Sequence, residues 1–278
     1  ENIDDIINYK LEPEIYNLKI LNAFLNRLED YSGIKLPIHI KIDTGMNRLG
    51  FSENEIEELS SYLKNEEKIT VRSVFSHLVA ADETAHDDFT NLQINKFRKM
   101  SEELINTIGY PVIMHIANTS GIERFPDAVF DMVRVGIGLY GFSMHDSEKL
   151  MNVSTLKTRI TQINEVKEGE SVSYGRRWVA DTDCKIAVIP VGYADGLNRH
   201  LSNEVGEVIV KGQKVPIVGN ICMDMCMINI TGLDVEEDDE VIIFGDEQAA
   251  NVLAKKLDTI PYEIITGISE RVKRVYKG

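Results

Sequence analysis

The chain has 278 residues, with 45 Asp and Glu against 30 Lys and Arg, so its formal charge is −15 at pH 7. This acidity excludes a protein that binds the phosphate backbone of nucleic acids, because such a protein needs a concentrated basic face. No apolar run reaches the roughly 18 to 20 residues that cross a bilayer, and three cysteines are too few for a disulfide scaffold. These features predict a soluble cytoplasmic protein without a membrane or nucleic-acid partner.

The first half of the chain alternates helical and strand-like patterns. Apolar residues recur at helical spacing over 15–28 and 89–108, and Ser52 and Glu55 have the spacing of a capping box before a third helix. Strands are predicted over 38–43, 71–78, 112–118 and 133–140. Strands separated by helices pair in parallel through right-handed crossovers, so this half is an α/β domain.

The pattern changes after about residue 146. Six strand-like segments follow, at 153–166, 184–191, 207–210, 215–218, 221–231 and 240–244, with one helix at 247–257. We therefore predict an α/β domain over 1–146 and a mainly-β domain over 147–278. Four β/α units are half of a (β/α)8 TIM-type barrel, which takes about 250 residues, although an open sheet is also possible. Since the chain opens at Glu1 without an initiator Met, we expect a fragment whose first barrel half lies upstream.

Polar residues gather at the carboxyl ends of the predicted strands, where barrel and open-sheet enzymes place their sites. Arg134 lies in an apolar segment and is costly to bury unless it is paired. Thr119 and the backbone of Gly136 and Ile137 offer a hydroxyl and unhindered N–H groups, which suit a phosphate. The other candidates at these strand ends are Lys41, Asp43, Arg48, His77, Asp82, His115, Asn118 and Ser120.

Four segments resemble motifs of the alanine racemase family: residues 41–50 (KIDTGMNRLG), 134–141 (RVGIGLYG), 192–196 (GYADG) and 221–224 (ICMD). They occur in the family's order along the whole chain. The resemblance implies a pyridoxal-phosphate-dependent barrel followed by a β-domain, in a head-to-tail homodimer whose subunits share active sites. It also implies that L- and D-alanine are interconverted by two-base exchange of the α-proton, which supplies D-alanine for peptidoglycan.

The resemblance further implies roles for individual residues. Tyr193 matches the catalytic tyrosine that exchanges the α-proton on one face, in the site of the neighbouring subunit. Arg134 matches the arginine that faces the pyridine nitrogen, and His77 matches the histidine that bonds to this arginine and to the tyrosine. The remaining matches are phosphate-binding positions (Thr119, Gly136, Ile137), positions for the substrate carboxylate (Arg48 and the backbone of Met223) and a lysine that is carbamylated in many members and then orients Arg48 (Lys41).

The sequence departs from the family pattern at three points. No segment resembles the AxxKANAYGHG-like motif with the Schiff-base lysine, so this chain carries one of the two acid-base groups that racemisation needs. The phosphate-site serine is Thr119, which keeps a hydroxyl. A C-terminal tyrosine common in the family is Glu270 here, and we expect its carboxylate to point away from the phosphate it would repel.

Three alternatives stay open at this point. The substrate could be serine, given Glu270. The chain could be a non-catalytic homologue or dimerisation module. A metal-dependent barrel hydrolase could use His77, His115 and Asp43, although no residues have the spacing of a metal site and we expect no metal.

Overall fold

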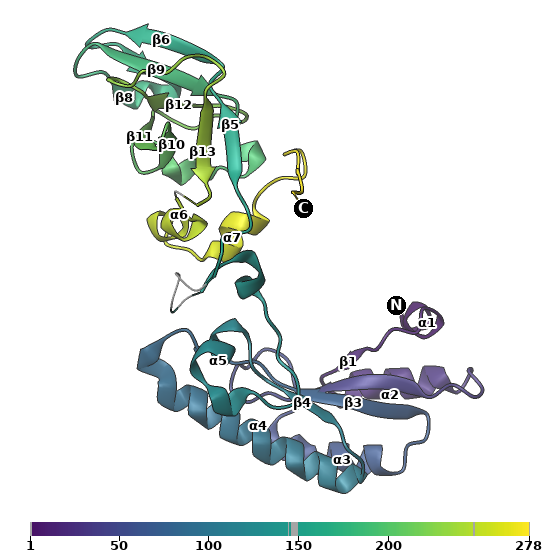
Figure 1. Cartoon of the computed structure of the whole chain (residues 1–278). Coiled ribbons are helices and arrows are strands. Elements are labelled where there is room, and N and C mark those ends of the chain that lie inside the picture. The colour runs from purple at the N-terminus through teal and green to yellow at the C-terminus, as the bar shows by residue number, and fades with distance from the viewer. Residues whose placement is uncertain (1, 144, 146–149, 247, 278) are drawn as a thin grey trace. The chain divides into compact units, whose positions relative to one another are not determined.

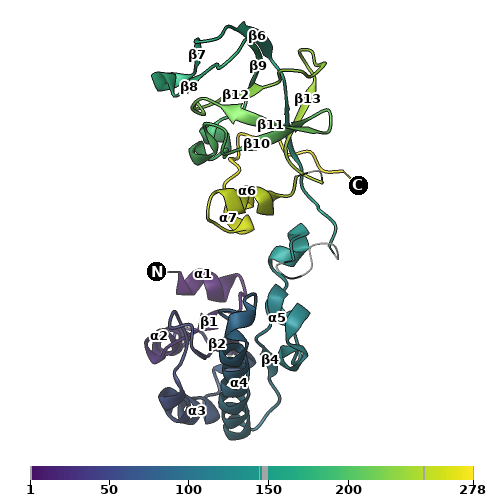
Figure 2. The same ribbon diagram turned by 90° about the vertical axis from the view of Figure 1, so that its left-hand side faces the viewer.

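The structure is a computed structural model that describes residues 2–143, 145, 150–246 and 248–277. The chain divides into two compact units, of which unit 1 is Glu1–Leu139 with Ser143–Lys149 and unit 2 is Tyr140–Phe142 with Leu150–Gly278 (Figures 1 and 2). The predicted boundary between residues 146 and 147 lies outside the described residues. Within the described ranges, every helix is too short or too polar to span a membrane.

Unit 1 is built on a parallel sheet whose strands follow one another in the order β1-β2-β3-β4. This consecutive order is that of an arc of a β/α barrel, because a doubly wound sheet reverses its order at a switch point. The strands are β1 (Glu14–Ile15), β2 (Leu36–Lys41), β3 (Ile69–Phe75) and β4 (Ile113–His115). The helices are α1 (Ile3–Asn8), α2 (Leu18–Leu28), α3 (Ile56–Lys64), α4 (Asp87–Ile108) and α5 (Thr119–Arg124). The barrel-type α/β prediction is confirmed.

The helices of unit 1 start and stop where local chemistry dictates. The predicted capping box is confirmed, since the Ser52 N–H donates to Glu55 Oε2 at 2.8 Å ahead of α3. Helix α4 ends at Gly109, which has a φ of +78°. Helices α3 and α4 pack against each other (Figure 2), and their buried apolar faces join the strands in one core.

Two predictions in unit 1 are wrong. Residues 133–140 do not form a strand: Ile137–Tyr140 is a short 3-10 helix. The Gly136 and Gly138 amides donate to Thr119 Oγ1, so they are not available for a ladder. Conversely, Ile15 is not helical but pairs with β2 as part of β1, because α2 is capped only at Asn17.

Unit 2 contains a seven-stranded antiparallel sheet, which confirms the predicted mainly-β domain. Its order is β5-β13-β10-β11-β12-β9-β6, with bounds β5 (Leu156–Arg159), β6 (Gln162–Val166), β9 (Cys184–Ile189), β10 (Glu207–Val210), β11 (Gln213–Val218), β12 (Cys226–Asn229) and β13 (Glu240–Phe244). A separate ribbon joins β7 (Ser171–Val172) to β8 (Trp178–Val179). The predicted helix is α6 (Ala250–Lys256), and a second, α7 (Pro261–Thr266), follows it.

Candidate active site

Arg134 lies at the carboxyl ends of β3 and β4, where three acceptors hold its guanidinium. Its Nη1 is 2.5 Å from His115 Nδ1 and donates to the His115 carbonyl at 3.3 Å, while Nη2 donates to the Ser76 carbonyl. Burial lowers the pKa of Arg134, and the nearby Glu14 carboxylate opposes this. A guanidinium stays charged over the physiological range. The site therefore contains a fixed positive charge.

Phe75 forms the platform of this cluster. Its ring stacks on that of His115, with centroids 5.1 Å apart and planes 4° from parallel. Two cations also lie near the ring, with Arg134 Cζ at 5.2 Å and Lys41 Nζ at 5.3 Å from its centroid. Such contacts are favourable because the face of an aromatic ring carries a negative electrostatic potential. The Lys41 ammonium is in turn 3.1 Å from Glu14 Oε1.

His77 follows β3 and is half-buried beside these cations. Burial is the main cause that lowers its pKa, and the positive charges of Arg134, Arg48 and Lys41 lower it further. The imidazole is consequently neutral at physiological pH. Among the described residues, no hydrogen bond links its ring to Arg134, whose ring partner is His115 instead. The role predicted for His77 stays a prediction.

The loop after β2 carries Arg48 and is ordered by Asp43. One carboxylate oxygen of Asp43 accepts the N–H groups of Gly45, Met46 and Asn47 at 2.9, 3.0 and 3.1 Å. Arg48 itself is exposed. With Asp43 engaged in this turn, and both ring nitrogens of His115 hydrogen-bonded, two of the three residues of the hydrolase alternative already have hydrogen-bond partners. The described residues contain no group of three or more potential metal ligands.

Thr119 begins α5 and brings together the groups predicted for phosphate binding. Its Oγ1 accepts the N–H of Gly136 at 3.0 Å and that of Gly138 at 3.2 Å. A Cβ at Gly138 would lie 2.9 Å from Thr119 Cγ2, so the backbone approaches the side chain as closely as glycine allows. Since Oγ1 accepts from both amides, the Thr119 hydroxyl keeps its own proton to donate, which suits a phosphate oxygen. Ile137, between the glycines, is buried.

Unit 2 brings Tyr193 and Met223 together by backbone hydrogen bonds. The Tyr193 N–H donates to the Cys222 carbonyl at 3.1 Å, and the Ala194 N–H donates to the Met223 carbonyl at 2.8 Å. Tyr193 and Met223 nevertheless remain 45% and 57% exposed. The two sequence motifs therefore form one structural element that presents a phenol and a methionine to the outside of the unit.

Both units match one family. The sequence profile described as "Alanine racemase, N-terminal domain" matches residues 1–144, and that of the C-terminal domain matches 153–276.

The chain belongs to the alanine racemase family.

Among curated relatives, alanine racemase 2 of Caldanaerobacter subterraneus subsp. tengcongensis is 42% identical, over 94% of this chain and 69% of the relative. The alanine racemase of Thermodesulfovibrio yellowstonii is 39% identical, over 99% of this chain and 74% of the relative.

Solved alanine racemases have the same fold. The enzyme from D-cycloserine-producing Streptomyces lavendulae matches with a TM-score of 0.93 at 31% identity, over 99% of this chain and 75% of that one. The Bartonella henselae alanine racemase, solved with covalently bound pyridoxal phosphate, matches with a TM-score of 0.90 at 29% identity, over 100% of this chain and 76% of that one.

Gln93 is a residue of this alanine racemase fold that sequence reasoning missed. It lies on α4 and is fully buried, and its Nε2 donates to Thr44 Oγ1 at 3.1 Å and to the His77 carbonyl at 3.2 Å. Its Oε1 accepts the Val79 N–H at 3.1 Å. Gln93 thus fixes the loops after β2 and β3. The available signal was a polar residue four positions before Phe97 on the apolar face of a helix.

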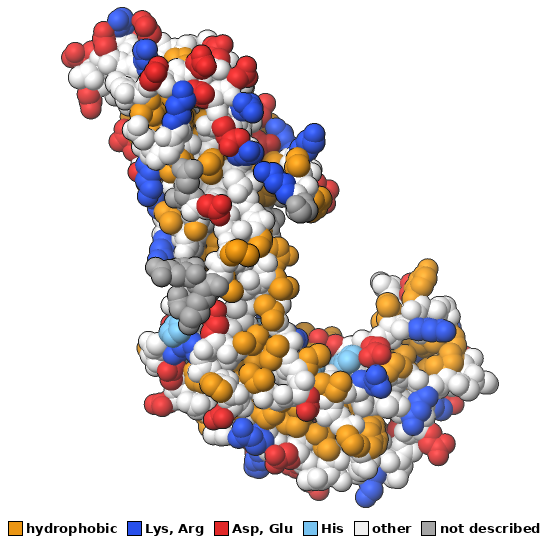
Figure 3. Space-filling model, in the orientation of Figure 1, with side chains coloured by type: hydrophobic (Ala, Val, Ile, Leu, Met, Phe, Trp, Pro, Cys, Tyr) orange, Lys and Arg blue, Asp and Glu red, His pale blue; other side chains and the backbone are white. Residues whose placement is uncertain are grey.

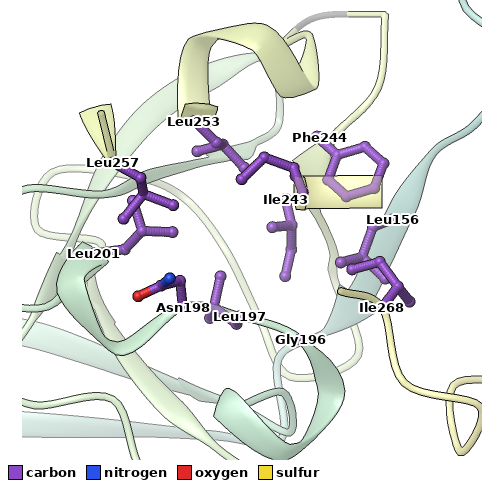
Figure 4. A pocket seen from close by; sticks show the side chains of 11 residues that line it. Leu156, Gly196, Leu197, Asn198, Leu201, Ile243, Phe244, Leu253, Leu257 and Ile268 are labelled. Atoms are coloured by element: carbon purple, nitrogen blue, oxygen red, sulfur yellow. The ribbon is translucent and has the colours of Figure 1, made fainter. Parts of the chain in front are cut away.

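A small apolar cavity in unit 2 is lined in part by Gly196, Leu197 and Asn198, which follow the Tyr193 turn in the chain (Figure 4). Its volume is about 20 Å³, room for a single water at most. Its walls include Gly196, Leu197, Leu201, Ile243, Leu253 and Ile268. An apolar space of this size does not hold an amino acid, and it belongs to the packing of the turn.

Proposed function

We propose that this chain supplies one of the two acid-base groups of an enzyme that interconverts L- and D-alanine with pyridoxal phosphate, in the cytoplasm, and that the product supplies D-alanine for peptidoglycan. The observation that carries the proposal is Arg134, a half-buried fixed charge held by a histidine ring and two carbonyls. An arginine that donates to the pyridine nitrogen keeps that nitrogen unprotonated and so limits how far the ring withdraws electrons. Membership of the alanine racemase family supports the same activity.

The residues present fit the cofactor. The Thr119 hydroxyl, which accepts two amides and so keeps its own proton to donate, would hold the phosphate together with the backbone of Gly136 and Ile137. Arg134 would face the pyridine nitrogen. When bound, pyridoxal phosphate supplies a conjugated ring that makes the α-proton of an attached amino acid acidic.

The remaining steps fall to residues of both units. Arg48 and the backbone of Met223 would bind the substrate carboxylate and so orient the Cα–H bond. Tyr193 would transfer the proton on one face at its phenol oxygen. A cofactor-bonding lysine would serve the other face, and the family motif that carries it does not occur in these 278 residues. Lys41 would orient Arg48, in its carbamylated form where that modification occurs.

We also propose that the enzyme acts as a homodimer in which Tyr193 and Met223 complete the neighbouring subunit's site. Their exposure supports this, because a catalytic phenol needs a surrounding that excludes water. Apolar side chains of unit 1 are exposed as well, including Met132, Val135 and Leu139, all within five positions of Arg134 in the sequence. On the face shown in Figure 3, basic side chains are scattered among acidic ones, and apolar side chains lie between them.

The proposal is tested with Tyr193→Phe in the enzyme that includes the cofactor-bonding lysine. Racemisation should fall by roughly 10²- to 10⁴-fold, the contribution of a positioned general acid or base, while the cofactor stays bound. Tyr62→Phe is the matched control, since Tyr62 is 46% exposed, close to the 45% of Tyr193. Near-wild-type turnover of Tyr193→Phe would contradict the proposed role, and absence of turnover in the unaltered enzyme would contradict the activity.

A further inference from the structure

A chain of hydrogen bonds runs from Arg134 across unit 1 to the surface. Arg134 Nη1 is 2.5 Å from His115 Nδ1, and His115 Nε2 is 3.1 Å from Ser73 Oγ. Ser73 Oγ is 2.6 Å from His39 Nδ1, and His39 Nε2 is 2.9 Å from Glu12 Oε2. His115, Ser73 and His39 lie on β4, β3 and β2, and Glu12 lies two residues before β1. We call these five residues the relay.

With neutral rings at His115 and His39, the two ends of the relay fix the direction of every bond in it. A guanidinium only donates hydrogen bonds and an ionised carboxylate only accepts them. His115 must therefore accept at Nδ1 and carry its proton on Nε2, which donates to Ser73 Oγ. The Ser73 hydroxyl then donates to His39 Nδ1, and the His39 Nε2–H donates to Glu12. All four bonds point from Arg134 toward Glu12.

The middle of the relay is buried, and its far end is exposed to solvent. Ser73 and His115 are 1% and 4% exposed, so water cannot replace their hydrogen bonds. The side chains of His39 and Glu12 are 30% and 42% exposed. Burial first, and then the charge of Arg134, lower the pKa of His115 to about 4. The His115 ring is thus neutral at physiological pH, and only its tautomer is left to be decided.

Ser73 alone does not decide this tautomer, because a hydroxyl both donates and accepts. If its hydroxyl turned toward His115 Nε2, the ring proton would move to Nδ1 and face the N–H of Arg134. Two donors would then oppose each other, and the guanidinium would have to turn away. His39, which offers Ser73 an acceptor and is itself oriented by Glu12, removes this alternative.

We propose that Ser73, His39 and Glu12 are positioning residues for Arg134, which hold His115 in the tautomer whose Nδ1 lone pair faces the guanidinium. The consequence for catalysis rests on the proposed function, in which Arg134 faces the cofactor ring. A guanidinium oriented before binding loses less side-chain freedom when the cofactor arrives. The relay would thus connect an exposed acidic residue to the electronic control of the cofactor.

The first test reads the histidine tautomers by long-range ¹H–¹⁵N correlation in the ¹⁵N-histidine-labelled chain, at neutral pH and without cofactor. We expect His115 and His39 to carry their protons on Nε2. Glu12→Ala should raise the population of the other His115 tautomer about fivefold, the factor that one neutral hydrogen bond contributes. Glu83→Ala is the matched control, since Glu83 lies 3.5 Å from the exposed His86 outside the relay, and it should change nothing at His115.

The second test reads Arg134 itself, from the rate of rotation about its Cζ–Nε bond in ¹⁵N-arginine-labelled chain. Ser73→Ala and Glu12→Ala should speed this rotation about fivefold. Ser73→Thr, which keeps the hydroxyl, should rotate at the rate of the unaltered chain. Glu12→Ala changes a partly exposed residue, so it answers the question even if Ser73→Ala does not fold.

A proton on His115 Nδ1 in the unaltered chain, or rotation unchanged by Glu12→Ala, would overturn the inference. Failure of the unaltered chain to bind pyridoxal phosphate would count against the proposed function and leave the relay intact, because neither readout involves the cofactor.

Discussion

Asp195 Oδ1 is 2.8 Å from Arg271 Nε, and this ion pair joins the turn that carries Tyr193 to the C-terminal segment that carries Glu270. The other oxygen of Asp195 accepts the Gly192 N–H at 2.9 Å, so the carboxylate is shared between the two segments. The pair lies in unit 2 and has one nearly buried partner and one half-exposed partner. Glu270, next to Arg271, is exposed. The segment that differs from the family pattern is thus fixed beside the turn that carries Tyr193.

Removing the cation of this pair should loosen the turn without unfolding the unit. In Arg271→Ala, Asp195 keeps the Gly192 N–H, and a half-exposed ion pair contributes only about 0 to 1 kcal/mol. We expect faster amide hydrogen exchange over 193–196, measured by mass spectrometry. Asp195→Ala should have the larger effect, since it leaves the Gly192 N–H without its acceptor and destabilises unit 2 by about 1 to 3 kcal/mol.

The control for these variants is Lys167→Ala, which breaks an exposed ion pair with Asp183 elsewhere in unit 2. Unfolding of this unit can be followed by fluorescence, because the chain's one tryptophan is Trp178 on β8. Equal exchange over 193–196 in Arg271→Ala and Lys167→Ala would show that the Asp195 pair does not restrain the turn.

Gly192 determines how closely the two motifs of unit 2 approach each other. A Cβ at this position would lie 2.4 Å from the Cys222 carbonyl oxygen and 2.5 Å from that of Met223. Both neighbours are backbone atoms and cannot turn aside, so Gly192→Ala must separate Tyr193 from Met223. We expect a loss of about 1 to 3 kcal/mol in the free energy of unfolding, followed by Trp178 fluorescence in urea.

Gly212→Ala separates steric from conformational effects in this experiment. Gly212 has a φ of +75°, but its added Cβ would meet nothing within 4 Å. Gly212→Ala should lower the free energy of unfolding by only about 1 to 2 kcal/mol, the cost of a left-handed conformation for an L-residue. The amide hydrogens of the Tyr193 turn should exchange at the normal rate. Normal exchange over 193–196 in Gly192→Ala would contradict the close approach.

Periodicity predicted the elements that are long and face one core. The helices α3 and α4 and the strands β2 and β3 all show a regular apolar pattern, which burial enforces. The prediction of a strand at 133–140 was wrong because the apolar pattern carries no information about hydrogen bonds to distant residues. Two amides of this segment donate to the Thr119 hydroxyl. The two residues of β1 are too few to give any pattern.

The sequence indicated candidate site residues but not the contacts among them. Motifs indicated Arg134 and Tyr193, whereas the partner of Arg134 is His115, 19 positions away. Ser73 and His39 are polar residues inside apolar strands, and this was a usable signal. Their connection depends on strand register, which pairs His39 with Ser73 across β2 and β3 and follows only from the three-dimensional fold.

Thr119 offers a direct test of phosphate binding. Thr119→Val removes the hydroxyl at nearly constant volume, and the affinity for pyridoxal phosphate should fall roughly tenfold or more, as for loss of a hydrogen bond to a charged group. Thr119→Ser should bind normally. Titration with pyridoxal, which lacks the phosphate, should give equal affinities for all three proteins. An equal loss for both ligands in Thr119→Val would mean that Thr119 shapes the pocket instead of binding the phosphate.

The low pKa of His115, about 4 in the folded chain because of burial and then the Arg134 charge, should make unit 1 sensitive to acid. The unfolded histidine has a pKa near 6.5, so between these values the unfolded chain binds a proton that the folded chain does not. The free energy of unfolding should therefore decrease as the pH is lowered through this window, by at most about 3 kcal/mol. Hydrogen exchange in β3 and β4 would measure it. His115→Gln should flatten the dependence, whereas His86→Gln, at an exposed histidine, should not. An unchanged slope in His115→Gln would show that His115 is not the group that titrates.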